Sequence, residues 1–135
     1  MRSRFSAFAL GLGTYLVDTL ASGHDDRRLP RETLARELGR AKERQRFLDL
    51  KIWWSSDTEV LFFARVFERG QDLSFAELST FVEEEGTIRY LRGVVVPREK
   101  LSSIDGMDRA AFLTIVAREE QAATKSRYHP GNKPR

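Results

Sequence analysis

Hydrophobic and polar positions alternate most clearly between residues 46 and 96. Four runs in this region repeat with a period of two, which is typical of β-strands. They cover residues 46–54, 58–67, 75–82 and 87–96, and Ser, Asp, Gly and Glu residues typical of turns separate them. Because consecutive strands joined by short turns pair in opposite directions, the pattern predicts an antiparallel sheet of four or more strands.

The second run is hydrophobic at both its odd and its even positions. Such a strand is predicted to lie centrally, with protein on both faces of the sheet. Helices can cover one face, and a second copy of the chain is the simplest cover for the other. The sequence therefore predicts a homodimer with the interface residues Leu61, Phe63, Arg65 and Phe67. In the first run, strict alternation places one group on a shared face: Leu48, Leu50, Ile52 and Trp54.

Three other segments carry hydrophobic residues at the period of an α-helix. The first is predicted to span about residues 3–21, with Ser3 as its N-cap and Gly23 as its stop. The second covers about residues 30–44, and the third follows a capping Asp108 and ends near residue 123. Helices followed by a meander of strands predict an α+β fold, in which a curved sheet wraps around the first helix as a cone with an inner cavity.

This pattern divides the chain into three parts. Residues 1–104 form the predicted α+β domain, and residues 105–124 form a C-terminal helix with its connection. Residues 125–135 are basic, contain two prolines and no acid, and are predicted to be disordered.

Composition narrows the possible chemistry. The 135 residues include no cysteine, which excludes disulfides, thiolate catalysis and cysteine-ligated zinc, and which fits a cytoplasmic location. His24 and His129 lie in separate polar segments, so the sequence predicts neither a metal site nor a cofactor. Arg2 and Arg4 precede an apolar run, which is the form of a signal peptide. The hydrophobic residues of this run recur at the period of a helix, and Asp18 interrupts it, so a helix that docks on the core is favoured.

Charge bears on the choice of partner. The formal net charge is +3, and the segment 30–44 is rich in Arg and Lys. Acidic residues interleave these bases and no aromatic residue accompanies them, which favours a solvated helix face over a nucleic-acid site. No apolar run reaches the ~20 residues that span a bilayer, so no membrane association is predicted.

Five motifs resemble a known family in their order and spacing. They are MRSRFSAFALG at the start, RFLDLKI at 46–52, VLFFARVF at 60–67, ELSTF at 77–81, and the glycine–tyrosine–glycine set of Gly86, Tyr90 and Gly93. Over about residues 1–97 the chain resembles the middle domain of the bacterial YchJ-like, SEC-C-motif-associated proteins. This resemblance implies the cone-shaped fold of nuclear-transport-factor-2-like proteins (also described as SnoaL-like or cystatin-like). It implies a fold rather than a particular reaction.

The chain departs from the family pattern at several points. Family members usually carry a cysteine-rich zinc-binding segment beside this domain, and without cysteine the zinc function is not carried over. Ile88 stands where the family has an aromatic residue, and Arg92 stands where it has an acid. The residues after Pro97 match no part of the family pattern.

The candidate site centres on Glu77, which shares a predicted strand face with Phe75 and Phe81 and so points inward. A buried carboxylate needs a partner. An arginine of the first helix could form an ion pair that locks helix to sheet. Alternatively, Glu77 is a polar anchor or a general base at the floor of the cavity, with tyrosines as hydrogen-bond donors. No catalytic residue is assigned, and the candidate cavity residues are Arg2, Arg4, Tyr15, Glu77, Ser79 and Tyr90.

Two functions follow from these residues. We expect a non-catalytic module that binds a small apolar ligand in the cone or a protein partner. The alternative is a small-molecule enzyme of the isomerase, cyclase or dehydratase type that uses Glu77. The surroundings of Glu77 distinguish them, because an arginine-paired Glu77 without a cavity excludes the enzyme, whereas an unpaired Glu77 in an open apolar pocket favours it.

Overall fold

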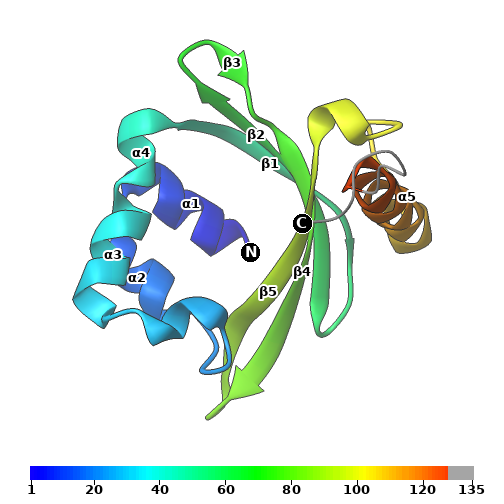
Figure 1. Ribbon diagram of the computed structural model, residues 1–135. Helices are drawn as coiled ribbons and strands as arrows, with labels where there is room; N and C mark the ends of the chain where they lie inside the picture. Colours follow the sequence, from blue (N-terminus) through cyan, green and yellow to red (C-terminus); the bar gives the residue numbers. More distant parts are fainter. Residues whose placement is uncertain (128–135) are drawn as a thin grey trace.

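The sheet lies between two layers of helices in the computed structural model, which describes residues 1–127 (Figure 1). The predicted disorder of the tail falls largely on residues 128–135, which lie outside the described residues, and the division into three parts stays a prediction. The helices are α1 (Arg2–Leu10), α2 (Gly13–Asp18), α3 (Arg31–Gly39), α4 (Ala41–Arg44) and α5 (Arg109–Arg127), with short 3₁₀ turns at Asp25–Arg28 and Arg98–Lys100. None of the described helices is long and apolar enough to cross a membrane.

The sheet is antiparallel throughout. Its strands are β1 (Arg46–Ser55), β2 (Glu59–Glu68), β3 (Gln71–Asp72), β4 (Phe75–Glu84) and β5 (Thr87–Pro97), in the order β1-β2-β4-β5, and β3 pairs with β2. The four long strands confirm the predicted meander, and the α+β class is confirmed. The sheet curves around α1, so that α1–α4 face its concave side and α5 its convex side (Figure 1). This arrangement leaves a space between α1 and the sheet in which a site can form.

The N-terminal segment is broken, although a single helix was predicted for it. The helix α1 ends at Gly11, whose φ of 72° is left-handed and reverses the chain direction. The predicted caps are also wrong, because Ser3 lies inside α1 and α2 ends at Asp18, well before Gly23. The second predicted helix is likewise divided into α3 and α4 at Arg40.

The break lets two helices pack at very short range. The backbone of Gly13, at the start of α2, lies against α3, and a Cβ atom there would overlap the carbonyl of Ala35. Val17 of α2, Leu20 shortly after it and Leu34 of α3 form a buried hydrophobic cluster. The absence of a side chain at Gly13 therefore permits this close approach of α2 to α3.

The convex face of the sheet is covered by the chain itself at one end. Phe112 and Ile115 of α5 pack on Leu61, Phe63 and neighbouring strands, and both β2 residues are at most 3% exposed. The predicted Asp108 cap is confirmed, since its carboxylate accepts a hydrogen bond of 2.8 Å from the Ala111 amide. The expectation that Leu61 and Phe63 await a second copy loses its physical reason, because α5 supplies the cover; dimerisation itself stays a prediction.

The side-chain alternation of β1 is interrupted twice. Register shifts lie between Phe47 and Asp49 and between Ile52 and Trp54. The prediction that Leu48, Leu50, Ile52 and Trp54 share a face is therefore wrong: Leu50 and Ile52 pack in the concave-side cluster, Trp54 packs in the convex-side cluster, and Leu48 is half exposed. A bulge moves each later side chain to the opposite face, which strict alternation does not foresee.

We predict that Gly13→Ala lowers the free energy of unfolding by roughly 1–3 kcal/mol, because the added methyl group forces α2 away from the Ala35 carbonyl. Urea unfolding followed by circular dichroism measures the change. Gly23→Ala is the matched control, since a Cβ there would meet only Leu91 Cδ1 at an ordinary 3.5 Å. Equal stability of the Gly13→Ala variant and the parent would contradict this packing.

Candidate functional site

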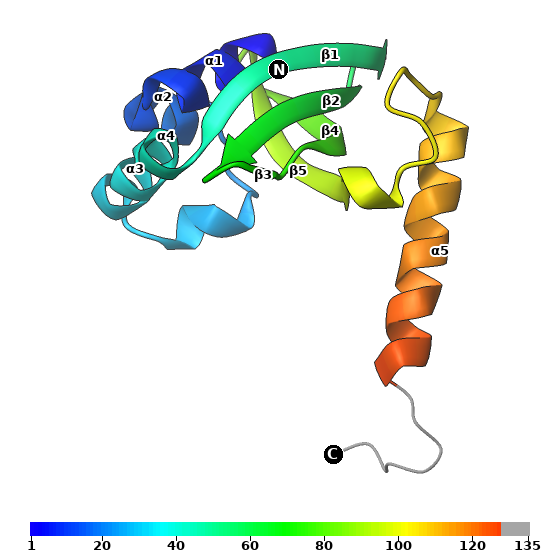
Figure 2. The same ribbon diagram turned by 90° about the horizontal axis from the view of Figure 1, so that it is seen from above.

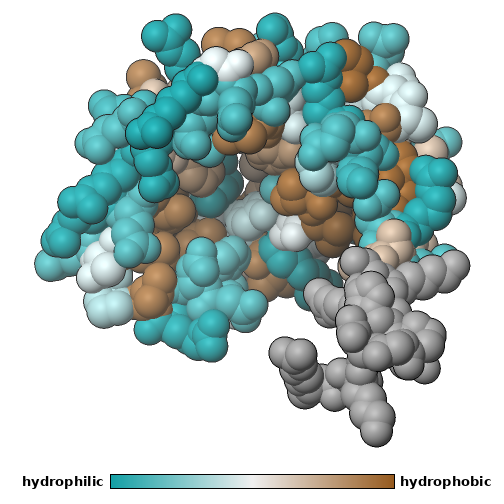
Figure 3. Space-filling model, turned by 45° about the horizontal axis from the view of Figure 1, so that its top comes forward, coloured by the Kyte–Doolittle hydropathy of each residue, from teal (hydrophilic) through white to brown (hydrophobic). Residues whose placement is uncertain are grey.

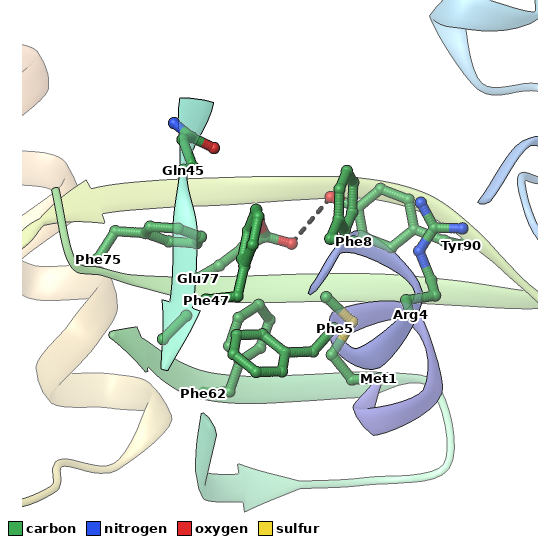
Figure 4. Close-up of a pocket in the computed structure, with 11 residues that line it drawn as sticks. Met1, Arg4, Phe5, Phe8, Gln45, Phe47, Phe62, Phe75, Glu77 and Tyr90 are labelled. Atoms are coloured by element: carbon green, nitrogen blue, oxygen red, sulfur yellow. Dashed lines mark hydrogen bonds between the residues drawn. The ribbon is translucent and has the colours of Figure 1, made fainter. Parts of the chain in front are cut away.

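An apolar pocket of about 260 Å³ lies between α1 and the concave face of the sheet. We call it the cone pocket, and Figure 4 shows the side chains around it. It is lined by Met1, Arg4, Phe5, Phe8, Gln45, Phe47, Phe62, Ala64, Phe75, Glu77 and Tyr90. The molecular surface is hollowed near the centre of the face in Figure 3, with hydrophobic side chains around the hollow. A volume of this size holds a molecule of about one ring.

Phenylalanines from four elements build the apolar part of the cone pocket. Phe47 of β1 contacts Phe5 edge-on and stacks on Phe8, each with ring centroids 5.8 Å apart. On the floor, Phe62 of β2 meets Phe75 of β4 at 6.2 Å. Of these residues the sequence placed only Phe75 on the inward face, beside Glu77. The side chains of Phe47 and Phe62 reach the same pocket because β1 carries a bulge directly after Phe47.

Glu77 provides the acidic group of the cone pocket. It is 8% exposed, and its Oε2 atom accepts hydrogen bonds from the Tyr90 hydroxyl at 2.8 Å and from the Ser79 hydroxyl. The Oε1 atom accepts no hydrogen bond from residues 1–127 and is not fully enclosed, so it is accessible from the pocket. One carboxylate oxygen is thus held rigidly while the other is available to a ligand.

Arg4 lies beside this group without forming an ion pair with it. Its guanidinium donates to the Leu16 carbonyl at 2.9 Å and to the Thr19 hydroxyl, and it sits 4.8 Å above the Tyr90 ring. Burial lowers the pKa of Arg4, and the electrostatic attraction of Tyr90 and Glu77 acts in the opposite direction. The predicted ion pair between helix and Glu77 is therefore absent from the described residues, and two hydroxyl groups stand in its place.

Tyr90 connects the helices, the sheet and the carboxylate. Its amide donates to the Thr19 carbonyl and its carbonyl accepts from the Ala21 amide, both at 2.7 Å, so the segment after α2 adds to the edge of β5. The phenol points into the cone pocket toward Glu77 (Figure 4). Burial first, and then the charge of Glu77 and its hydrogen bond, raise the pKa of Tyr90 well above its usual value.

Gly93 makes room for this arrangement. It lies directly opposite Ser79 in the β4–β5 pairing. A Cβ atom at this position would overlap the carboxylate of Glu77 and the hydroxyl of Tyr90. The spacing of Tyr90 and Gly93 in sequence is thus explained by contact, because both residues surround one carboxylate group.

The structure brings together four of the six predicted cavity residues. Arg4, Glu77 and Tyr90 line the cone pocket, and the fully buried Ser79 supports Glu77 from behind. Arg2 is exposed and does not line the pocket. Tyr15 is 40% exposed, and its hydroxyl donates to Ser3 on the surface. The predicted single helix over residues 3–21 would have kept Tyr15 in line with Arg4, and the break at Gly11 turns α2 in another direction.

Comparison with known proteins agrees with this architecture. The family model of the YchJ middle NTF2-like domain matches residues 1–93. The chain belongs to the YchJ-like middle-domain family. Its structure is also similar to the solution structure of a SEC-C motif containing protein from Rhodopseudomonas palustris, with a TM-score of 0.56 and 27% sequence identity over 71% of this chain and 75% of that one. No curated protein matches the chain.

The match ends at Gly93, the residue that accommodates Glu77. All four clustered site residues of this YchJ-like domain therefore fall within the family match, whereas α5 falls outside it. Among residues 1–127, no three His, Asp or Glu side chains are grouped so that they could hold a metal ion.

We predict that Gly93→Ala destabilises the YchJ-like domain by roughly 1–3 kcal/mol, because its methyl group displaces the Glu77 carboxylate and the Tyr90 hydroxyl. In a Glu77→Ala background the same substitution should cost at least about 0.5 kcal/mol less, since one of the two displaced groups, the carboxylate, is gone. Urea unfolding of the four proteins measures this coupling. Additive effects would contradict the proposed contact.

We predict that Tyr90→Phe lowers stability near neutral pH, and that its difference from the parent shrinks as the pH rises above about 10. The raised pKa means that the folded state holds the phenolic proton more tightly than the unfolded state. That contribution is complete below the unfolded pKa and is lost as the pH rises through the folded value. Urea midpoints between pH 8 and 11 test this, with Tyr15→Phe as control; a difference that stays constant for Tyr90→Phe would contradict the assignment.

Proposed function

We propose that this YchJ-like domain binds a small, mostly apolar ligand in the cone pocket. The ligand has an apolar body and one hydrogen-bond donor. The observation that carries the proposal is the Oε1 atom of the buried Glu77, which accepts no hydrogen bond from the described residues and belongs to a side chain that lines a mostly apolar pocket. A carboxylate in such surroundings recognises a hydroxyl, amine or amide donor, because a ligand without one leaves the charged oxygen unpaired.

The lining supports binding more than acid–base catalysis. The pocket presents one carboxylate and no histidine. The Tyr90 phenol keeps its proton because its pKa is raised, and that proton already serves Glu77. General acid–base chemistry on a ligand needs a separate donor and acceptor at the reacting atoms. We therefore favour the non-catalytic ligand-binding module over the isomerase-like enzyme.

The sequence analysis used the surroundings of Glu77 to distinguish a binding module from an enzyme, and the structure matches neither description fully. Glu77 is partnered, but by hydroxyl groups and not by arginine, and a pocket remains. The Oε2 atom accepts the hydrogen bonds from Tyr90 and Ser79, and the Oε1 atom is left for a ligand in the pocket. This division is what a binding anchor requires. A protein partner and a cytoplasmic location remain proposals that rest on the exposed charged surface and the absence of cysteine.

The first test is native mass spectrometry of the purified protein, followed by a binding assay with model ligands. We expect benzylamine, a ring with a cationic donor, to shift amide resonances of the pocket in NMR, and benzoate, which repels Glu77, to shift none. Glu77→Gln should weaken benzylamine binding at least about tenfold, because a charged hydrogen bond is lost.

Glu83→Gln is the matched control, because this substitution makes the same chemical change at an exposed position of β4. It should leave benzylamine binding unchanged. Equal weakening in both variants, or benzylamine shifts confined to residues outside the cone pocket, would overturn the proposal. A small molecule released on denaturation of the purified protein would support it and identify the natural ligand.

A further inference from the structure

A second cleft, of about 660 Å³, lies at the end of the sheet where α4 and the start of β1 face the end of β2 and the turn toward β3. We call it the basic cleft. It is lined by Lys42, Glu43, Arg44, Gln45, Arg46, Leu48, Arg65, Phe67, Arg69 and Gly70. Five of these side chains are cationic and one is acidic. The cone pocket shares only Gln45 with it, so the two are separate sites.

Most of these cations have no partner in the protein. Arg65 pairs with Asp49 at 3.0 Å, and Lys42 reaches the Leu10 carbonyl at 3.5 Å. The side chains of Arg44, Arg46 and Arg69 form no hydrogen bond or ion pair with the part of the chain whose side chains the structure describes. Unpaired cations gathered around one cleft repel one another and attract an anion into it. Arginine in particular presents a planar set of donors that matches the oxygens of a phosphate group.

An aromatic side chain lies among these arginines. Phe67 is opposite Arg46 in the β1–β2 pairing, and Leu48, 49% exposed, lines the same cleft. Phe67 follows Leu61, Phe63 and Arg65 on one face of β2, of which α5 covers the first two. This face of β2 thus has a covered apolar end and an uncovered basic end. The segment 30–44 by itself offered no aromatic residue beside its bases, and the fold adds one from β2.

We propose that the basic cleft binds single-stranded nucleic acid, with phosphates on Arg44, Arg46 and Arg69 and a base stacked on Phe67. Cationic side chains that follow the backbone and an aromatic ring that stacks a base are the combination used for single strands. An acidic peptide would satisfy the arginines but would make no use of the aromatic ring.

Fluorescence anisotropy with a labelled oligothymidylate of about 12 nucleotides tests this proposal. We expect binding at about 50 mM salt that weakens as salt rises, because phosphate contacts release counterions. The double variant Arg44→Ala with Arg69→Ala should weaken binding at least about tenfold and lower the salt slope by about 1.4, since two phosphate contacts are lost. The variant Arg36→Ala with Arg118→Ala removes the same charge from exposed positions outside the cleft, and should change both quantities much less.

Phe67 supplies the second arm of the experiment. Both Phe67→Ala and Phe67→Leu should weaken binding roughly tenfold without changing the salt slope, because stacking is lost and charge is not. Phe67→Leu retains an apolar side chain, and circular dichroism verifies that each variant is folded. The proposal is overturned by absence of binding at low salt, or by equal losses in the two double-arginine variants. It is also overturned if polyglutamate of matched length competes as well as the oligonucleotide and the Phe67 variants bind normally, which would assign the cleft to an acidic protein.

Discussion

The fold is arranged around one buried carboxylate, Glu77, and the hydroxyl groups that hold it. Taking a carboxylate out of water is costly unless hydrogen bonds replace its hydration. Tyr90 and Ser79 replace part of it, and Arg4 lies near enough to stabilise the charge without direct contact. Ser79 and Tyr90 join β4 to β5 through this carboxylate, and the Arg4 guanidinium of α1 lies over the ring of the same Tyr90, which brings the helix against the sheet.

This interaction imposes conditions on the rest of the chain. Position 93 must lack a side chain, because the carboxylate occupies the space that a Cβ would need. Tyr90 must be anchored, which the backbone hydrogen bonds to Thr19 and Ala21 accomplish. Arg4 must turn toward Leu16 and Thr19, which requires the reversal at Gly11. The carboxylate that imposes these conditions is the group that the proposed ligand would meet in the cone pocket.

The two faces of the sheet have different roles as a result. The concave face holds the cone pocket under α1. The other face of β2 has an apolar end under α5, with Leu61 and Phe63, and continues with Arg65 and Phe67 into the basic cleft. The first part of α5 packs on the sheet, and its later turns extend away from it (Figure 2). Two clefts of opposite chemical character therefore occupy one small domain, one suited to an apolar molecule and the other to a polyanion.

Local pattern in the sequence was sufficient for the four long strands, their antiparallel pairing, the inward direction of Glu77 and the cap at Asp108, because alternation, turn residues and capping depend on neighbours in the chain. It was not sufficient where distant segments meet. The break at Gly11, the bulges of β1, the cover of Leu61 and Phe63 by α5, and the replacement of a predicted arginine partner by Tyr90 depend on which surfaces come into contact. Periodicity specifies which side of an element is apolar, but only packing determines what that side touches, and therefore which polar groups face a ligand.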